Sequence, residues 1–306
     1  MHMVLIPAIY SNERSRTMVN KSEKRLLKPL EEMDMIDDFL FTEIMSDEKN
    51  GIEVCSMILS CVLRRKIGKI HFTAQRALPG LSEKLHGIRM DAYVTEDDEA
   101  GEEGGNISVY DIEPDNRSSN KAGLPKRSRY YGDLVDVQLL NTGIDYEKLP
   151  ELITIFILSY DPFGEDALYY EAGSIIKTHP KIPYNDGVRR IFLYVNGKLP
   201  DNAGEDDKKL KNLLRYIGSS TKANVTDDTT KRLNEIVTVT KSKKDIGVRY
   251  MKSWEILRDA KEEGREEERA NTRAETERAD RAEQRADSAE QRVRELEAII
   301  AAKALS

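Results

Sequence analysis

The chain has 306 residues, of which 34% are charged and 39% hydrophobic, and its formal net charge is −7. That length suits one large α/β domain plus an appendage. The charged fraction exceeds the roughly 25% of ordinary globular proteins, so one segment must be unusually polar. Residues 255–306 are that segment, with 11 Lys or Arg and 15 Asp or Glu. The body is nearly neutral, so overall acidity says little about partners.

Cysteine and histidine usage excludes some classes of protein. Cys55 and Cys61 are too few for a disulfide framework, and the four histidines show no metal-ligand spacing, which argues against a zinc site. No apolar run approaches the ~18 residues of a membrane span, and the N-terminus lacks the basic region of a signal peptide. We therefore expect a cytoplasmic protein without membrane association.

Helical periodicity begins after a polar lead-in. Residues 1–30 show only weak periodicity and are expected to be a flexible lead-in. Apolar residues at helical spacing predict a first helix after it, and a second helix over 51–64, with Asn50-Gly51 as the break between them. The first helix is predicted from Met33, Ile36, Leu40 and Ile44.

Alternating apolar and polar residues predict the next strands. A short strand at 69–73 precedes one at 88–95, in which Asp91 lies on the polar register. An acidic, glycine-rich hairpin loop leads to a further alternating strand over 107–113. Because Pro114 cannot donate to a ladder, this strand is expected to end there or to lie at a sheet edge.

Helices and apolar strands follow in the second half. Pro125 favours a helix N-terminus, so a helix is predicted over 126–140. Its inner residues are expected to be Tyr130, Tyr131, Leu134 and either Val137 or Gln138. The apolar run at 152–158 is typical of a strand buried on both faces. This order indicates an α/β fold with a mixed central sheet flanked by helices. The remaining expected elements are a strand at 190–195 and helices at 205–217, at 228–241 and from 246 onward.

Two carboxylates on neighbouring strands are the candidate site. Strand pairing would bring Asp91 and Glu113 within reach of one ion. Hydrolysis of a phosphodiester without a covalent intermediate needs a metal ion, an attacking water and charge stabilisation. Mg²⁺ prefers a few carboxylates plus waters. On spacing alone, two solvated acids on strand faces remain the alternative.

Six motifs occur in a specific order, and together they resemble one family. They are DDFLFTEIMSD (37–47), GIRMD (87–91), VYDIEPD (109–115), LPKRSRYY (124–131), DPFG (161–164) and RYMKSW (249–254). In that order the chain resembles the PD-(D/E)XK nuclease family transposases, the Rpn group of recombination-promoting nucleases. The resemblance covers roughly residues 34–263.

The resemblance implies a restriction-endonuclease-like core over residues 31–250. It implies a DNA endonuclease that depends on Mg²⁺, with Mn²⁺ as a substitute, and that is linked to mobile elements or recombination. Asp91 matches the first sheet acid of the family and Glu113 the second. An acid of the first helix often completes such sites, and Asp38 and Glu43 are the candidates here.

Position 115 departs from the family pattern, which places Lys or often Gln two residues after the glutamate. The strand period of two points both side chains to one face, where a cation would orient water and stabilise negative charge. Asp115 can join metal binding but supplies no positive charge. Either Lys126 or Arg127 supplies the cation, or the protein is a catalytically weakened nuclease fold that binds DNA or directs assembly.

Basic residues follow Asp115 closely. Arg127, Arg129 and Lys121 are predicted to contact DNA phosphates. Cations in a first helical turn are mildly unfavourable for the helix dipole, so their presence indicates an anion nearby. The alternative is an ordinary solvated helix start.

The C-terminal segment, 251–306, carries a heptad pattern. Its a positions are 279, 286, 293 and 300, and its d positions are 282, 289 and 296. Arginines occupy g and glutamates occupy e, so parallel pairing is attractive at every g–e′ contact and antiparallel pairing is repulsive. We therefore expect a homodimer through a parallel coiled coil at 275–300. The alternative is a single solvated helix held by i,i+4 ion pairs.

Overall fold

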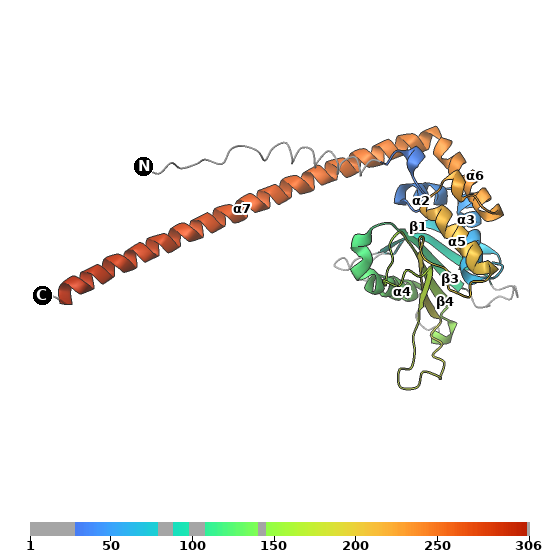
Figure 1. The fold of residues 1–306 in the computed structure, drawn as a ribbon, viewed down its shortest axis with the longest axis horizontal. Coiled ribbons are helices and arrows are strands. Elements are labelled where there is room, and N and C mark those ends of the chain that lie inside the picture. The colour runs from blue at the N-terminus through green and yellow to red at the C-terminus, as the bar shows by residue number, and fades with distance from the viewer. Residues whose placement is uncertain (1–27, 79–87, 98–107, 140–144, 305–306) are drawn as a thin grey trace. The chain divides into compact units, whose positions relative to one another are not determined.

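The computed structural model describes residues 28–78, 88–97, 108–139 and 145–304 (Figure 1). The chain divides into two compact units, one that ends at Gly247 and one that begins at Val248. The first unit is an α/β fold, and the second is the greater part of one long helix. The first unit contains every residue of the candidate site.

A mixed six-stranded sheet forms the centre of the first unit. Its strands are β1 (Ile70–Leu78), β2 (Ile88–Glu96), β3 (Ser108–Asp115), β4 (Glu151–Leu158), β5 (Tyr169–Ala172) and β6 (Val188–Tyr194). Their order across the sheet is β1-β2-β3-β4-β6-β5. The pairs β3–β4 and β4–β6 are parallel, and the other three pairs are antiparallel. The mixed α/β sheet predicted from the order of elements is confirmed.

Helices flank the sheet on both faces (Figure 1). One face carries α4 (Leu124–Leu139), and α2 (Asp38–Met45) and α3 (Glu48–Leu63) pack on the other. Two further helices, α5 (Glu205–Gly218) and α6 (Asp228–Ser242), pack against α3 and α2. Single 3-10 turns are η1 (Leu30–Glu32), η2 (Ser118–Gly123), η3 (Tyr146–Lys148) and η4 (Lys222–Asn224).

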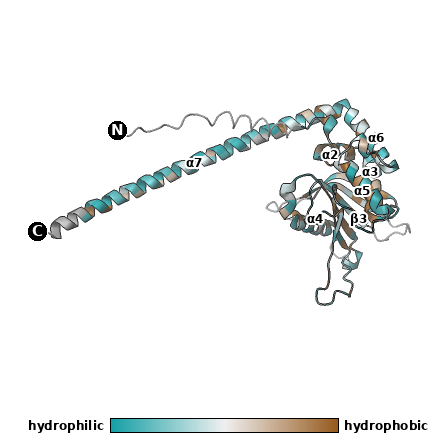
Figure 2. Cartoon of the chain, in the orientation of Figure 1, coloured by the Kyte–Doolittle hydropathy of each residue, from teal (hydrophilic) through white to brown (hydrophobic). Residues whose placement is uncertain are grey.

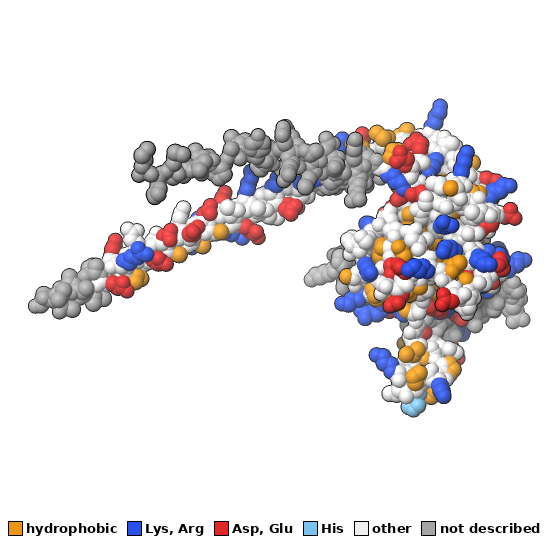
Figure 3. Space-filling model, viewed as in Figure 1, with side chains coloured by type: hydrophobic (Ala, Val, Ile, Leu, Met, Phe, Trp, Pro, Cys, Tyr) orange, Lys and Arg blue, Asp and Glu red, His pale blue; other side chains and the backbone are white. Residues whose placement is uncertain are grey.

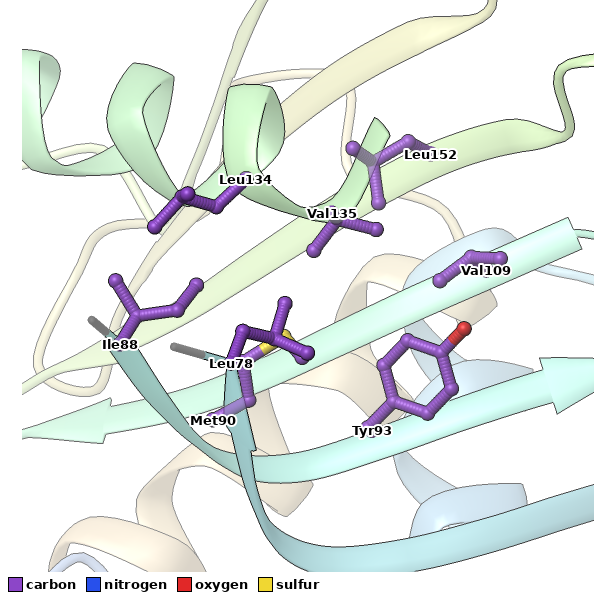
Figure 4. Close-up of a cluster of buried hydrophobic side chains, with 8 residues drawn as sticks. All are labelled: Leu78, Ile88, Met90, Tyr93, Val109, Leu134, Val135 and Leu152. Carbon is purple, nitrogen blue, oxygen red and sulfur yellow. The ribbon is translucent and has the colours of Figure 1, made fainter. Parts of the chain in front are cut away.

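The helix α4 packs on the sheet through Leu134 and Val135, which belong to one buried cluster with Ile88 of β2, Val109 of β3 and Leu152 of β4 (Figure 4). Tyr130 and either Val137 or Gln138 were expected on this face, but all three are exposed. The buried face of the helix also holds the small residues Ser128 and Gly132. Hydrophobic residues alone therefore did not predict which face of α4 is buried. Figure 2 shows the contrast between the apolar interior and the hydrophilic surface of this unit.

The first predicted helix is shorter than its periodicity suggested. The helix α2 begins at Asp38, and the preceding residues form a turn in which the Asp34 amide donates to Asp37 Oδ2 at 2.8 Å. The Asp34 carboxylate accepts from the Ser220 amide at 2.7 Å, and the Ile36 amide donates to the Ile217 carbonyl. Bonds to the end of α5 therefore replace helical bonds here, although Ile36 is buried as expected.

The predicted break at Asn50-Gly51 lies inside a helix. α3 begins at Glu48, and Asp47 caps it by accepting from the Asn50 amide at 3.1 Å. Gly51 has a packing role, because a Cβ at this position would collide with the ring of Phe72 on β1. The glycine marks a close approach of helix and sheet.

Pro114 does not end its strand. β3 continues to Asp115 in the interior of the sheet, paired with β4 along its whole length. On its other side the ladder with β2 stops at Ile112, two residues before the proline. Pro114 therefore lies where that neighbour no longer requires an amide donor. The expectation that β3 ends or lies at a sheet edge at Pro114 was therefore wrong on the side where β3 pairs with β4.

The second unit is the part of α7 (Lys244–Ala304) from Val248 on. Acidic and basic side chains alternate along it (Figure 3), and two i,i+4 pairs are formed, Arg281–Glu277 at 2.9 Å and Arg294–Glu290 at 3.4 Å. The seam residues Val293 and Leu296 are 52% and 48% exposed. Within the described part of the chain, no helix has the length and apolar character needed to cross a membrane.

Candidate functional site

A pocket of about 370 Å³ lies where β2 begins and β3 ends. Both predicted metal-binding acids, Asp91 and Glu113, line it, and so does Asp115. We call it the carboxylate pocket. The other lining residues are Asp38 of α2, Ile88 and Arg89 of β2, Pro114 of β3, Arg117, and Arg127, Tyr130 and Tyr131 of α4.

Asp91 lies at an irregular point of β2. Met90 and Tyr93, three residues apart, pack in the same hydrophobic cluster, so the predicted strict alternation breaks between them. Gln75 of β1, opposite Asp91 in the register, has a left-handed φ of +51° and leaves the ladder unpaired at this step. Its side-chain amide donates to Asp91 Oδ1 at 2.8 Å and to Thr42 Oγ1 at 3.3 Å. Gln75 thus fixes one oxygen of the carboxylate.

Glu113 is held by the backbone of the neighbouring strand. It is 5% exposed, and its Oε1 accepts from the Asp91 amide at 2.8 Å. Burial raises the pKa of Glu113 well above its usual range, and the charges of Asp111 and Asp91 raise it further. Burial also raises the pKa of Asp91. The site therefore favours a proton or a cation among its carboxylates.

Asp111 is the functional candidate that sequence reasoning missed. It is fully buried two residues before Glu113 on the same strand face, and within the described residues neither of its carboxylate oxygens has a hydrogen-bond donor. Burial raises its pKa to about 7, and the charge of Asp91 acts in the same direction. The signal was present in the alternating spacing of Asp111, Glu113 and Asp115.

Asp115 occupies the position where the family pattern has Lys or Gln, and it draws a cation in from α4. Arg127 Nη2 lies 2.8 Å from Asp115 Oδ2, and the aspartate side chain is only 2% exposed. The Arg117 amide donates to Asp115 Oδ1 at 2.9 Å, and the Tyr160 hydroxyl lies 3.3 Å from Oδ2. The Arg127 guanidinium also lies over the ring of Phe156, 5.1 Å from its centroid.

The other predicted site residues either line the carboxylate pocket or lie outside it. Of the two residues considered as a source of positive charge, Arg127 lines the pocket, whereas Lys126 is exposed outside its lining. Arg129 and Lys121 are exposed and are likewise outside the lining. Arg89 and Arg117 are the other two arginines in the lining. Of the two candidate third acids, Asp38 lines the pocket and Glu43 does not.

The donor set suits a cation that takes few protein ligands. Among the described residues no three His, Cys, Asp or Glu side chains are arranged as a metal cluster. Mg²⁺ commonly uses one or two carboxylates and keeps several waters. Asp91 and Glu113 meet that requirement. Burial is the main cause of the raised pKa of each, and neighbouring carboxylates add to it, so a cation would stabilise their charged forms.

Comparisons with protein-family models, with curated proteins and with solved structures found no match to this chain.

Proposed function

We propose that this protein is a metal-dependent DNA endonuclease that hydrolyses phosphodiester bonds at the carboxylate pocket. The observation that carries the proposal is the convergence of Asp91, Glu113 and Arg127 on one pocket. Two carboxylates suit a divalent cation, and an arginine suits a phosphate oxygen. The ordered motifs that resemble the Rpn group support the same chemistry and suggest a link to transposition or recombination.

Asp91 and Glu113 would hold Mg²⁺, or Mn²⁺ in its place. The bound cation would supply an activated water and stabilise charge on the phosphate. The chain's own contribution is positional. Gln75 orients Asp91, and the Asp91 amide orients Glu113, so both carboxylates are preorganised. Arg127 would face the scissile phosphate, while Asp115 fixes the direction of its guanidinium.

A second candidate function follows from the same ion pair. Asp115 already engages Arg127 at 2.8 Å, and the pairing offsets part of its positive charge. If that charge is too small in the transition state, the fold would bind DNA or direct assembly without efficient cleavage. The exposed cations Lys121, Lys126 and Arg129 would then serve as phosphate contacts.

Plasmid cleavage tests the proposal. Supercoiled DNA is incubated with the wild type, Asp91→Asn or Glu113→Gln in Mg²⁺ or Mn²⁺. We expect nicking by the wild type and a loss of roughly 100-fold or more in each variant, as for the removal of one preorganised charge-stabilising group. Asp133→Asn on the exposed side of α4 is the matched control and should retain activity.

Two outcomes would redirect the interpretation. Nicking that persists undiminished in both variants would exclude the carboxylate pocket as the site. DNA binding by a wild type that cleaves nothing in either metal would favour the second candidate function.

A further inference from the structure

An exposed aromatic ring ends a row of aromatic side chains that begins at the carboxylate pocket. The sheet register places Glu113 beside Phe156, Phe156 beside Phe192, and Phe192 beside Tyr170, all on the α4 face. Phe156 and Phe192 are stacked at 5.7 Å and are fully buried. Phe163 meets Phe192 and Tyr170 edge-on, at 5.2 and 5.1 Å, and is 46% exposed.

The loop that carries Phe163 is fixed by one aspartate. Asp161 Oδ1 accepts from the Phe163 amide at 3.1 Å and from the Tyr170 hydroxyl at 2.8 Å. Its Oδ2 accepts from the Asp166 amide at 2.9 Å. Gly164 and Asp166 both take left-handed backbone angles, with φ of +94° and +54°. The chain thus keeps an apolar ring at the surface on a constrained loop, at a conformational cost.

The distance from the pocket suits a nucleic-acid strand. Two strand spacings of ~4.8 Å separate β3 from β6, so Phe163 lies roughly 10–15 Å from Glu113. Where the bases of a strand stay stacked, each nucleotide advances ~3.4 Å, so this distance corresponds to at most about three or four nucleotides. Arg127, which lies over Phe156, supplies positive charge between the pocket and the ring.

We propose that Phe163 stacks on an unpaired base of the strand whose phosphate lies in the carboxylate pocket. This inference rests on the proposed nuclease function and narrows its substrate to nucleic acid with single-stranded or frayed nucleotides beside the cut. Aromatic rings stack on any base, so the contact selects unpaired structure and tolerates any sequence. In a duplex, the faces of each base are already stacked on the neighbouring bases, so Phe163 has no free base to stack on.

Binding of fluorescent oligonucleotides to the full chain tests the inference. Single strands that carry 2-aminopurine at successive positions are titrated in EDTA and in Ca²⁺, and anisotropy and quenching are recorded. Phe163→Leu should weaken single-strand binding about 5- to 100-fold and abolish position-dependent quenching. Phe163→Tyr and Phe163→Trp should retain both, and the affinity for a fully paired duplex should change little in all three variants.

Tyr146→Leu is the matched control, because Tyr146 is 82% exposed on η3, at the opposite end of β4 from the Phe163 loop. Wild-type affinity and quenching in Phe163→Leu would overturn the stacking inference, and wild-type plasmid cleavage in Mg²⁺ would show that the nuclease proposal stands. Equal weakening of single-strand binding by Tyr146→Leu would also overturn the stacking inference. A wild type that binds no nucleic acid in any buffer would overturn both.

Discussion

We expect the stability of the fold to depend on pH through Asp111. Burial raises its pKa from 3.8 to about 7, so between these values the folded state binds more protons than the unfolded state. Its contribution to stability is therefore fully present below about pH 4 and is lost as pH rises through about 7. Asp111→Asn should raise the free energy of unfolding at pH 8 by on the order of 2 kcal/mol. The free energy of unfolding of this variant should also fall less than that of the wild type as pH rises.

Urea unfolding in EDTA from pH 5 to pH 8 checks this prediction, with Asp133→Asn on exposed α4 as control. An unchanged pH slope in Asp111→Asn would mean that the buried carboxyl does not titrate in this range. Added Mg²⁺ should reduce the difference between wild type and variant at pH 8, because a cation compensates the same excess of negative charge.

The Arg127–Asp115 pair invites a double-mutant cycle. Arg127→Gln leaves a carboxylate that is 2% exposed without its guanidinium, and should cost about 2–4 kcal/mol of folding free energy. Asp115→Asn combined with Arg127→Gln should recover most of that loss. Cleavage should not recover, because the double variant still lacks the cation that we propose faces the phosphate.

Chemical unfolding and plasmid nicking, measured on the same preparations, separate a structural role of Arg127 from a role in cleavage. Lys126→Gln, the exposed neighbour, should change neither quantity much. If the double variant cleaves as well as the wild type, Arg127 is a structural partner of Asp115 and contributes nothing to catalysis.

The sequence identified some site residues and missed others for clear physical reasons. Strand alternation brought out Asp91 and Glu113, and the structure brings them to one pocket. Asp111 was missed because a strand's period shows which acids share a face but not which of them are buried. Gln75 was missed because its contact depends on its own left-handed backbone angle and on the register of β1 against β2, which local sequence patterns do not show.

At the scale of elements, β1 positions the site through Gln75. Gln75→Ala removes the donor that orients Asp91 Oδ1, which lies 2.8 Å away. Such partners of metal ligands commonly affect metal affinity 10- to 100-fold. We therefore expect Mn²⁺ binding, measured by calorimetry, to weaken about tenfold or more, and cleavage to require correspondingly more metal.

The control for this prediction is Gln138→Ala, an exposed glutamine of α4. Gln75→Gly should also weaken metal binding but be more stable than Gln75→Ala by about 1 kcal/mol, because glycine adopts the left-handed angle without strain. Unaltered Mn²⁺ affinity in both Gln75 variants would contradict a positioning role.

Element boundaries were predictable only where local rules decide them. Apolar runs gave β4 and β6 nearly in full, and hydrophobic periodicity gave the buried residues of α2 and α3. The start of α2 and the end of β3 depend on partners distant in sequence, namely Ser220 and β4. Hydrophobic periodicity over a short window carries no information on such partners, so the predicted start of α2 and end of β3 were wrong.

At the scale of the whole molecule, the order of elements was enough to predict a mixed α/β sheet, since connections and layer packing permit few arrangements. It did not predict the short edge strand β5, which has only four residues. The long C-terminal helix was predictable because charged residues and regular heptads dominate its sequence.

We propose that α7 forms a parallel homodimer through its heptad seam. Parallel pairing sets Arg278, Arg285 and Arg292 of one chain against glutamates of the other, whereas antiparallel pairing sets like charges together. The same helix satisfies some charges by itself, as in Arg281–Glu277, so a solvated single helix competes. Each exposed pair contributes only ~0.2–1 kcal/mol, so the summed difference between arrangements decides direction.

Reversing the g-position charges should dissociate this dimer. Changing Arg278, Arg285 and Arg292 to Glu should lower the mass measured by light scattering from dimer to monomer, as should deletion of residues 270–306. Mixing that variant with one whose glutamates at 283, 290 and 297 are changed to Arg should restore a dimer of the two. Arg281→Glu and Arg294→Glu, outside the seam, are the controls.

Cysteine cross-linking tests the direction of the pair. Ala286 occupies an a position, so in a parallel, in-register coil its two copies face each other, and Ala286→Cys should oxidise to a covalent dimer. The variant is made with Cys61→Ser, because Cys61 is half-buried whereas Cys55 is buried. Gln284→Cys, on the outer face, should cross-link far less. A dimer by mass that resists cross-linking at 286 would exclude the parallel register, and a monomer at every concentration would establish the single helix.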